Sequence, residues 1–228
     1  MKRLMRRHHG FWNDQRKHSL YLGFLLLMLA LVVQINAGQY SSRRALDANP
    51  VGDLFLDNLP VLNLDYIIVQ GALIMYIIGG YLFITRPREL LLGAKAFALF
   101  VIIRAFFMNL TYMGIYPRNL FDVSGPGAGF FSAITFDGNF FFSGHTGLPF
   151  LMALIFWREK HWRYFFVFVS VFFGMAALLA HVHYSIDVFA APFITYTIFQ
   201  IVAHLFPRDY ALLAGSAPRG GILVDEIK

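Results

Sequence analysis

Two short segments of the chain carry residue types that could transfer a phosphate-bearing group. In the first, Ser143, Gly144 and His145 follow three consecutive phenylalanines. In the second, His183 precedes Asp187 by four residues, a spacing that places both side chains on one face of a helix. An Asp so placed would keep the imidazole neutral and oriented for attack on phosphorus. We therefore predict His183 as the nucleophile, Asp187 as the residue that orients it, and His145 as the general acid and base.

Other residues could hold the charge of the phosphate. Ser143 is well placed as an N-cap, the free amides of the following turn would attract an anion, and Gly144 would let it approach closely. Only two charged residues, Arg104 and Asp187, fall outside the predicted loops and termini. A charge at membrane depth is costly and is either functional, a snorkelling side chain or a helix cap. At about 1.5 Å per residue, Arg104 lies roughly 14 Å from Lys95, close to the middle of the bilayer. We predict that Arg104, Ser143 and Gly144 bind the phosphate.

Two other chemistries fit these segments less well. A metal site would draw on the nearby His145, His181, His183 and Asp187. However, His181 and His183 lie two residues apart and would point to opposite sides of a helix. Ser143 lacks the flanking glycine spacing of a nucleophile elbow. The chain has no Cys, which excludes disulfides and thiolate metal sites, so we expect neither a metal nor a cofactor.

The elements that must position these residues are predicted to be membrane-spanning helices. Hydrophobic residues make up 58% of the chain and charged residues only 14%, whereas soluble domains carry about 25% charged residues. The apolar residues gather in long runs, and a helical span needs about 20 of them. We predict an all-α integral membrane fold, a bundle of six transmembrane helices. The six runs are Leu20–Ala37, Tyr66–Thr85, Ala96–Met113, Thr146–Trp157, Tyr164–Ala180 and Val188–Phe206.

The charges of the connecting segments predict the orientation of the bundle. The N-terminal segment and the second-to-third and fourth-to-fifth connections are basic, whereas the loops at about 38–65 and 114–143 are richer in Asp. The positive-inside rule therefore places both termini in the cytoplasm. Both histidine segments then lie at outward ends of helices, although the histidines were not used to assign the orientation. We expect a site on the extracytoplasmic face of a bacterial inner membrane, or of a eukaryotic secretory or plasma membrane.

We interpret the chain as one catalytic domain with two short ends. Residues 1–19 form a basic cytoplasmic N-terminus, residues 20–206 the six-span domain, and residues 207–228 a loosely ordered cytoplasmic tail. The start could alternatively be a signal peptide cleaved near Asn36, but the residues there fit a signal peptidase poorly. The net charge of +6 follows the loop pattern of a membrane protein, and no nucleic-acid partner is expected.

The two histidine segments resemble the catalytic motifs of a known family. Residues 142–146, Phe-Ser-Gly-His-Thr, and residues 183–188, His-Tyr-Ser-Ile-Asp-Val, are similar to the two motifs of sphingomyelin synthases. That family belongs to the lipid phosphate phosphatase, or type 2 phosphatidic acid phosphatase, superfamily. The resemblance extends over all six predicted spans, including residues 104–117 and an acidic first outer loop at residues 53–65. It implies a catalytic triad of His183, Asp187 and His145.

The resemblance also implies the reaction. The triad would move a phosphate-bearing headgroup from a glycerophospholipid donor to a lipid acceptor such as ceramide, releasing diacylglycerol. The phosphatases of the superfamily carry a Lys seven residues before an Arg-Pro pair and an Arg six residues before the second histidine. Neither is present here: Arg86-Pro87 has Gly79 at the first position and belongs to a predicted cytoplasmic loop, and Ala177 occupies the second position. This favours the synthase branch.

One departure bears on the headgroup. The synthases have an acidic residue four positions before the motif serine, where this chain has Asn139. If that acid recognises a cationic choline or ethanolamine, this protein either uses another donor or substitutes Asp137. We therefore predict that Asn139 and Asp137 contact the headgroup of the donor. Two alternative functions remain: a lipid phosphate phosphatase, in which water resolves the phosphohistidine, and a non-catalytic lipid-binding or lipid-translocating protein.

Overall fold

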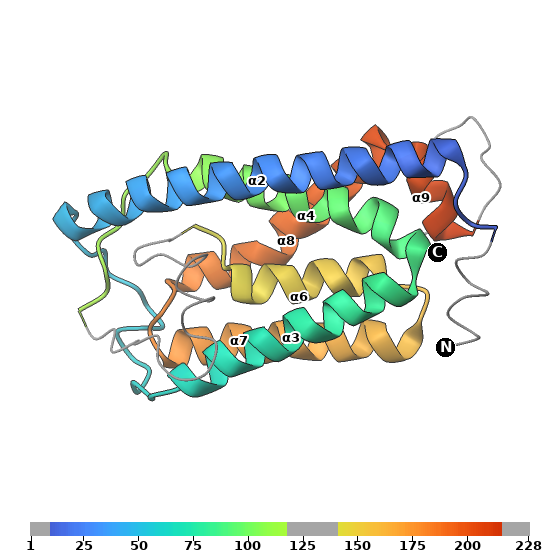
Figure 1. Ribbon diagram of the computed structural model, residues 1–228. Coiled ribbons are helices and arrows are strands. Elements are labelled where there is room, and N and C mark those ends of the chain that lie inside the picture. Colours follow the sequence, from blue (N-terminus) through green and yellow to red (C-terminus); the bar gives the residue numbers. More distant parts are fainter. Residues whose placement is uncertain (1–9, 118–140, 216–228) are drawn as a thin grey trace.

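The computed structural model describes residues 10–117 and 141–215, and within these residues every regular element is a helix (Figure 1). The prediction of an all-α fold is confirmed for this part of the chain. The helices are α2 (Asp14–Asp47), α3 (Asp65–Thr85), α4 (Pro87–Met108), α6 (Gly144–Ile155), α7 (Lys160–Leu179), α8 (Ser185–Leu205) and α9 (Pro207–Ala214).

Five of these helices are long and apolar enough to cross a membrane, namely α2, α3, α4, α7 and α8. The fourth predicted span corresponds to α6, which has only 12 residues. At 1.5 Å per residue its length is about 18 Å, against a hydrocarbon core of about 30 Å. The structure therefore supports a multi-pass membrane protein with five full-length helices and one short apolar helix.

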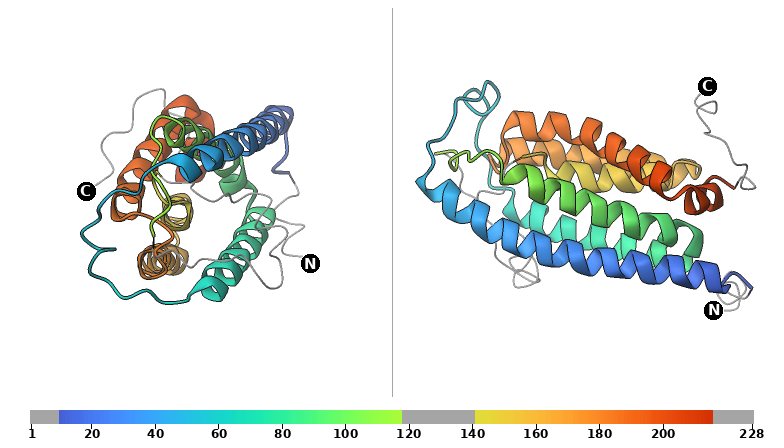
Figure 2. Two further views of the ribbon diagram at one scale, coloured as in Figure 1. Left: turned by 90° about the vertical axis from the view of Figure 1, so that its left-hand side faces the viewer. Right: turned by 90° about the horizontal axis from the view of Figure 1, so that it is seen from above.

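The short helix α6 lies inside the bundle. It contacts α3, α4, α7 and α8, while α2 packs along α4 on one side of the molecule (Figures 1 and 2). Gly147 shows how tightly α6 is enclosed, because a Cβ there would come within 2.8 Å of the Phe100 ring and 2.9 Å of the Thr195 hydroxyl. Most of the α6 side chains are consequently buried by the neighbouring helices.

Polar residues extend two helices beyond the apolar runs. α2 begins one residue after Asn13, whose side chain accepts a hydrogen bond from the Arg16 amide, and runs for 34 residues or about 51 Å. α4 begins at Pro87 and ends at Met108, whereas the sequence predicted a helix from Ala96 to Met113. Proline at the first helical position is favourable because its missing amide hydrogen is not needed there.

The revised bounds of α4 overturn the prediction that Lys95 lies in a loop. Lys95 is 1% exposed within α4, and its ammonium lies 2.7 Å from a carboxylate oxygen of Asp209. It also donates to the hydroxyl of Ser19 at 2.7 Å and to the carbonyl oxygen of Ser19 at 2.9 Å. The buried charge is tolerated because it is both paired and hydrogen-bonded.

Asp209 also corrects the expectation of a loose tail from Pro207. Residues Pro207–Ala214 form α9, which packs against α4 and α8. The Ser19 hydroxyl, near the start of α2, bonds to both carboxylate oxygens of Asp209 at 2.9 and 2.7 Å. The first turns of α2 and the helix α9 therefore meet at one end of the bundle (Figure 1).

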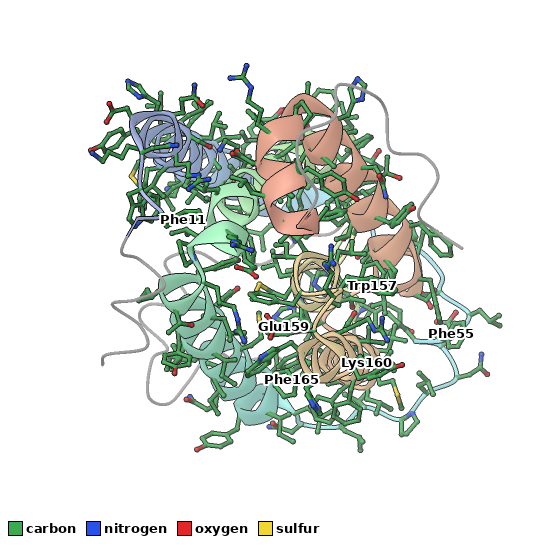
Figure 3. All side chains as sticks on the ribbon, turned by 90° about the vertical axis from the view of Figure 1, so that its right-hand side faces the viewer. Phe11, Phe55, Trp157, Glu159, Lys160 and Phe165 are labelled. Carbon is green, nitrogen blue, oxygen red and sulfur yellow. The ribbon has the colours of Figure 1, made fainter. Side chains whose placement is uncertain are left out.

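Two connections predicted to share one side of the membrane do lie together. Arg86, between α3 and α4, pairs with Glu159, between α6 and α7, at 2.7 Å. The Arg86 guanidinium also lies over the rings of Phe156 and Trp162. Figure 3 views the bundle from this end, where Glu159 and its neighbour Lys160 are labelled. The N-termini of α6 and α8, with the two histidine segments, lie at the opposite end (Figure 1).

Candidate active site

The first turns of α6 and α8 are bonded to each other. The Ser143 amide donates to the carbonyl oxygen of Asp187 at 2.9 Å, and the Phe141 amide donates to Asp187 Oδ1 at 3.1 Å. These bonds join segments that lie more than 40 residues apart in the sequence. The structure therefore brings together the two segments that the sequence singled out.

Ser143 caps α6, as predicted. Its backbone is extended, and its hydroxyl oxygen accepts a hydrogen bond from the Thr146 amide at 3.4 Å. Gly144, the first helical residue, leaves space on its outer side, because a Cβ there would meet only Arg104 Nε within 4 Å, at 3.9 Å. A helix N-terminus with open space beside a guanidinium suits a phosphate, since the helix amides and the dipole both favour an anion.

His183 and Asp187 are paired, although not on a common helix. α8 begins at Ser185, so His183 lies in the preceding turn and only Asp187 is helical. His183 Nδ1 lies 3.4 Å from Asp187 Oδ2, at the long end of the hydrogen-bond range. The predicted shared helix face is therefore replaced by a turn that folds the imidazole over the first turn of α8. Asp187 is 1% exposed, and its two carboxylate oxygens have different partners: Oδ1 accepts from the Phe141 amide, and Oδ2 faces Nδ1 of His183.

His145 faces His183 across the site. The two ring centroids are 5.6 Å apart with an interplanar angle of 62°. His183 is 4% exposed, and His145, in the first turn of α6, is partly buried. With hydrogen bonds of about 2.7 to 3.2 Å, both rings can reach oxygens of one phosphate group.

Arg104 completes the cluster from α4. It lies one turn before the end of that helix, and Lys95, from which its depth in the bilayer was predicted, lies inside the same helix. Its Nε donates to the carbonyl oxygen of Phe142 at 3.1 Å, and it is electrostatically attracted to Asp187. The side chain is 9% exposed, so a cation is held close to Gly144 in surroundings that strengthen its interaction with an anion.

Two residues beside the site have backbone conformations that side chains rarely adopt. Phe141, which directs its amide at Asp187, has φ of 88°, and His181, two residues before His183, has φ of 54°. Such conformations cost about 1 to 3 kcal/mol and gather at functional sites. Each of the two histidine segments therefore contains one residue with a strained backbone next to the site.

The remaining predicted residues concern the headgroup and the alternative of a metal site. Asn139 and Asp137, the predicted headgroup residues, lie outside the described residues. His181 packs edge-to-face against the Tyr116 ring, with centroids 5.2 Å apart. Across residues 10–117 and 141–215, no three His, Asp or Glu side chains are grouped as metal ligands would be.

The sequence did not single out Asp53, although it lies in the acidic connection predicted to be the first outer loop. Asp53 Oδ2 accepts a hydrogen bond from the Ser185 amide at 2.6 Å, and Oδ1 accepts from the amides of Phe55 and Leu56. Burial alone would raise the pKa of the Asp53 carboxyl, but these bonds and one from the Ser185 side chain hold the pKa below its usual value. The local signal was an Asp followed by amides two and three residues on, a common turn pattern that does not reveal its distant partner.

Comparison with known proteins agrees with the site. Residues 138–205 match the family model described as the C-terminal part of the PAP2 superfamily, a segment that includes both histidine motifs and helices α6, α7 and α8. No curated protein matches the chain. The match supports a likeness to the type 2 phosphatidic acid phosphatase superfamily, whose members are phosphatases or phosphotransferases. It suggests an activity of that type.

Proposed function

We propose that this protein is a membrane lipid phosphotransferase that moves a phosphate-bearing headgroup from a glycerophospholipid to a lipid hydroxyl, such as that of ceramide. The observation that carries the proposal is the pairing of two imidazoles, His145 and His183, 5.6 Å apart at adjoining helix N-termini. One imidazole is held by a buried carboxylate, and a buried guanidinium lies beside the open face of Gly144. This set of groups suits phosphoryl-group transfer through a phosphohistidine.

In the first half-reaction, the free nitrogen of His183 attacks phosphorus while Asp187 holds the other nitrogen. A nitrogen–phosphorus bond forms, and the bond from phosphorus to the glycerol oxygen breaks. His145 gives a proton to that oxygen, so diacylglycerol leaves as a neutral alcohol. The headgroup phosphate remains on His183.

In the second half-reaction, the acceptor hydroxyl attacks the same phosphorus. His145, now neutral, takes the hydroxyl proton, and the nitrogen–phosphorus bond breaks to restore His183. Arg104 and the amides after Ser143 stabilise the charge on the phosphate oxygens in both steps. No proton or electron is gained or lost over the cycle.

Two positions favour transfer over hydrolysis. Ala177 stands where the phosphatases carry an Arg, and Gly79 stands seven residues before Arg86-Pro87, a pair that lies at the end of the bundle opposite the histidines; both residues are buried against apolar neighbours. A Cβ at Gly79 would meet the Met152 side chain at 3.3 Å, and Ala177 packs in a cluster with Leu178 and Tyr184. Neither position offers a cation to a phosphate. The second candidate is a lipid phosphate phosphatase, which would use the same first half-reaction with water as the acceptor.

The test is a headgroup-transfer assay with purified protein in detergent. Fluorescent ceramide or diacylglycerol is incubated with mixed phospholipid donors, and the products are resolved by mass spectrometry. His183→Ala is compared with His204→Ala, an exposed histidine near the other end of the same helix α8. A new phospholipid that is lost only in His183→Ala supports the proposal. Dephosphorylated lipid without a new phospholipid favours the phosphatase, and equal products from His183→Ala point to a non-catalytic lipid-binding protein.

We also propose that α6 serves as the fourth of six spans, with both termini cytoplasmic and the site facing outward. The contact of Arg86 with Glu159 supports this arrangement, because it gathers the basic connections at one end. The chain has no Cys, so single cysteines can report sidedness. We expect a membrane-impermeant maleimide to label Asn58→Cys but not Lys160→Cys in intact cells or sealed vesicles. The reverse pattern would place the site on the cytoplasmic face.

A further inference from the structure

The first outer loop is bonded directly to the start of α8. Asp53 Oδ2 accepts a hydrogen bond of 2.6 Å from the Ser185 amide, the first amide of that helix. Helix amides in the first turn have no partner within the helix, so an outside acceptor is needed. The acceptor here comes from 132 residues earlier in the chain, and the Ser185 amide that it holds lies only two residues after His183.

Asp53 is itself held in place by its own loop. Its other oxygen accepts hydrogen bonds from the amides of Phe55 at 2.9 Å and Leu56 at 3.1 Å. Its amide donates to the Asp57 carboxylate at 3.2 Å. The Leu56 side chain is completely buried and packs in a cluster with Tyr184. The carboxylate therefore cannot turn away from Ser185 without breaking bonds on its other side.

A second contact holds the same turn through Tyr184. Its hydroxyl donates to the carbonyl oxygen of Gly114 at 2.8 Å and accepts from the Val51 amide at 3.3 Å. Tyr184 lies between His183 and Ser185 and is 1% exposed. The turn that carries His183 is thus fixed from the outer loops by two consecutive residues, one through its side chain and one through its amide.

Asp187 is held by contacts of its own as well as by the turn. It accepts hydrogen bonds from the amides of Phe141 and Ser143, just before α6, and its own amide donates to the Tyr184 carbonyl oxygen at 3.0 Å. His183 lies outside α8, so its position relative to Asp187 depends on the turn. Because their separation is already 3.4 Å, a small shift of the turn would break the pairing.

We propose that Asp53 is a positioning residue for His183. By holding the Ser185 amide, it keeps the imidazole within reach of Asp187 and facing His145. This inference rests on the proposed function, since it assigns the loop a part in the same reaction. It differs from a purely structural role, which would lower the amount of folded protein and leave the behaviour of each folded molecule unchanged.

The test compares Asp53→Ala and Asp53→Asn with Asn58→Ala. Asn58 is an exposed residue of the same loop whose side chain donates only to the nearby Leu54 carbonyl oxygen, so it is a matched control. Headgroup transfer is measured per folded protein, after size-exclusion chromatography, to give kcat and KM. Hydrogen exchange of the peptide covering residues 181–187 is measured on the same samples.

For Asp53→Ala we expect kcat to fall by about 10- to 100-fold, as for misplaced catalytic groups, with KM within about twofold. Asp53→Asn keeps one acceptor oxygen and should lose less. Exchange should rise in residues 181–187 and stay unchanged in α3, α4 and α7, while Asn58→Ala should match the unmodified protein. Unchanged kcat in folded Asp53→Ala, or increased exchange throughout the chain, would overturn the proposal.

The exchange measurement separates this inference from the proposed function. If the unmodified protein transfers no headgroup, the proposed function fails whatever the variants show. The positional claim is then decided by exchange alone: a rise confined to residues 181–187 in Asp53→Ala supports it, and no rise refutes it.

Discussion

Replacing Asp187 by Asn should abolish most activity while leaving the fold intact. In the native site, Oδ1 of Asp187 accepts from the Phe141 amide and Oδ2 faces Nδ1 of His183. The amide group of Asn has one acceptor and one donor. The acceptor must face the Phe141 amide, because the opposite orientation would bring two donors together. The NH₂ group therefore faces His183.

This orientation determines the size of the effect. An NH₂ group facing Nδ1 forces that nitrogen to accept, so the proton moves to the other ring nitrogen, which is the proposed nucleophile. The nucleophile then lacks a lone pair in the favoured tautomer. An equivalent carboxylate-to-amide change in hydrolytic triads costs about 10⁴-fold in kcat. That factor corresponds to about 5.4 kcal/mol of transition-state stabilisation, at 1.36 kcal/mol per factor of ten.

The assay is headgroup transfer in detergent, with thermal unfolding of each sample. Asp14→Asn is the control, since Asp14 is 91% exposed in the first turn of α2. We expect a Tm close to that of the unmodified protein for both variants and a loss of about 10⁴-fold in kcat for Asp187→Asn alone. A residual activity above roughly a tenth would show that the tautomer of His183 is not set by Asp187 and would refute the reasoning.

Three further predictions concern the site entrance, the outer loop and the far end of the bundle. Gly144→Ala should change the free energy of unfolding by less than about 1 kcal/mol, because the added Cβ meets only Arg104 Nε at 3.9 Å. It should raise KM for the phospholipid donor about tenfold, because the methyl group occupies the phosphate space. An unchanged KM would place the phosphate elsewhere. Because hydrogen bonds hold the pKa of Asp53 below its usual value, its contribution is present above the unfolded pKa of about 3.9 and is lost as the pH falls through the folded pKa. Exchange of residues 181–187, corrected for intrinsic rates, should therefore rise below about pH 4, and Asp53→Asn should remove that dependence. Asp209→Ala should lower the free energy of unfolding by about 3 to 5 kcal/mol, because the buried ammonium of Lys95 then has no carboxylate partner. The double change Lys95→Met with Asp209→Leu should lower it less, because no charge stays buried. Equal losses for the two variants in thermal unfolding would show that the unpaired ammonium is not the source of the cost.

The local parts of the site could be predicted from the sequence. Ser143 caps α6, and the His183 to Asp187 spacing does bring the two side chains together. Both results follow from interactions within a few residues, which residue type and spacing describe well. The helical form of the second pair was wrong, because α8 starts at Ser185, and an i to i+4 spacing does not distinguish a helix from the turn before one.

The errors arose where distant residues decide the outcome. Lys95 was assigned to a loop because a charge usually ends an apolar run, but its partner Asp209 lies 114 residues further on and was itself assigned to a loose tail. The same error moved the predicted start of the helix, so Arg104 lies near the end of α4 and not near the middle of the helix. Asp53 was overlooked for a related reason, since its role depends on the Ser185 amide, which no local pattern connects to it.

The buried contact between Lys95 and Asp209 also constrains the order in which the protein is made. At a synthesis rate of about 5 to 20 residues per second, the 114 residues between them take about 6 to 23 s to translate. During that time α4 is already made while its lysine has no carboxylate partner from α9. Until α9 arrives, the ammonium has the oxygens of Ser19 and Leu91 as partners but no carboxylate to balance its charge. Final packing of α4 against α2 and α9 is then one of the last events of biosynthesis, and a ribosome that stalls before residue 209 leaves the bundle open at this end.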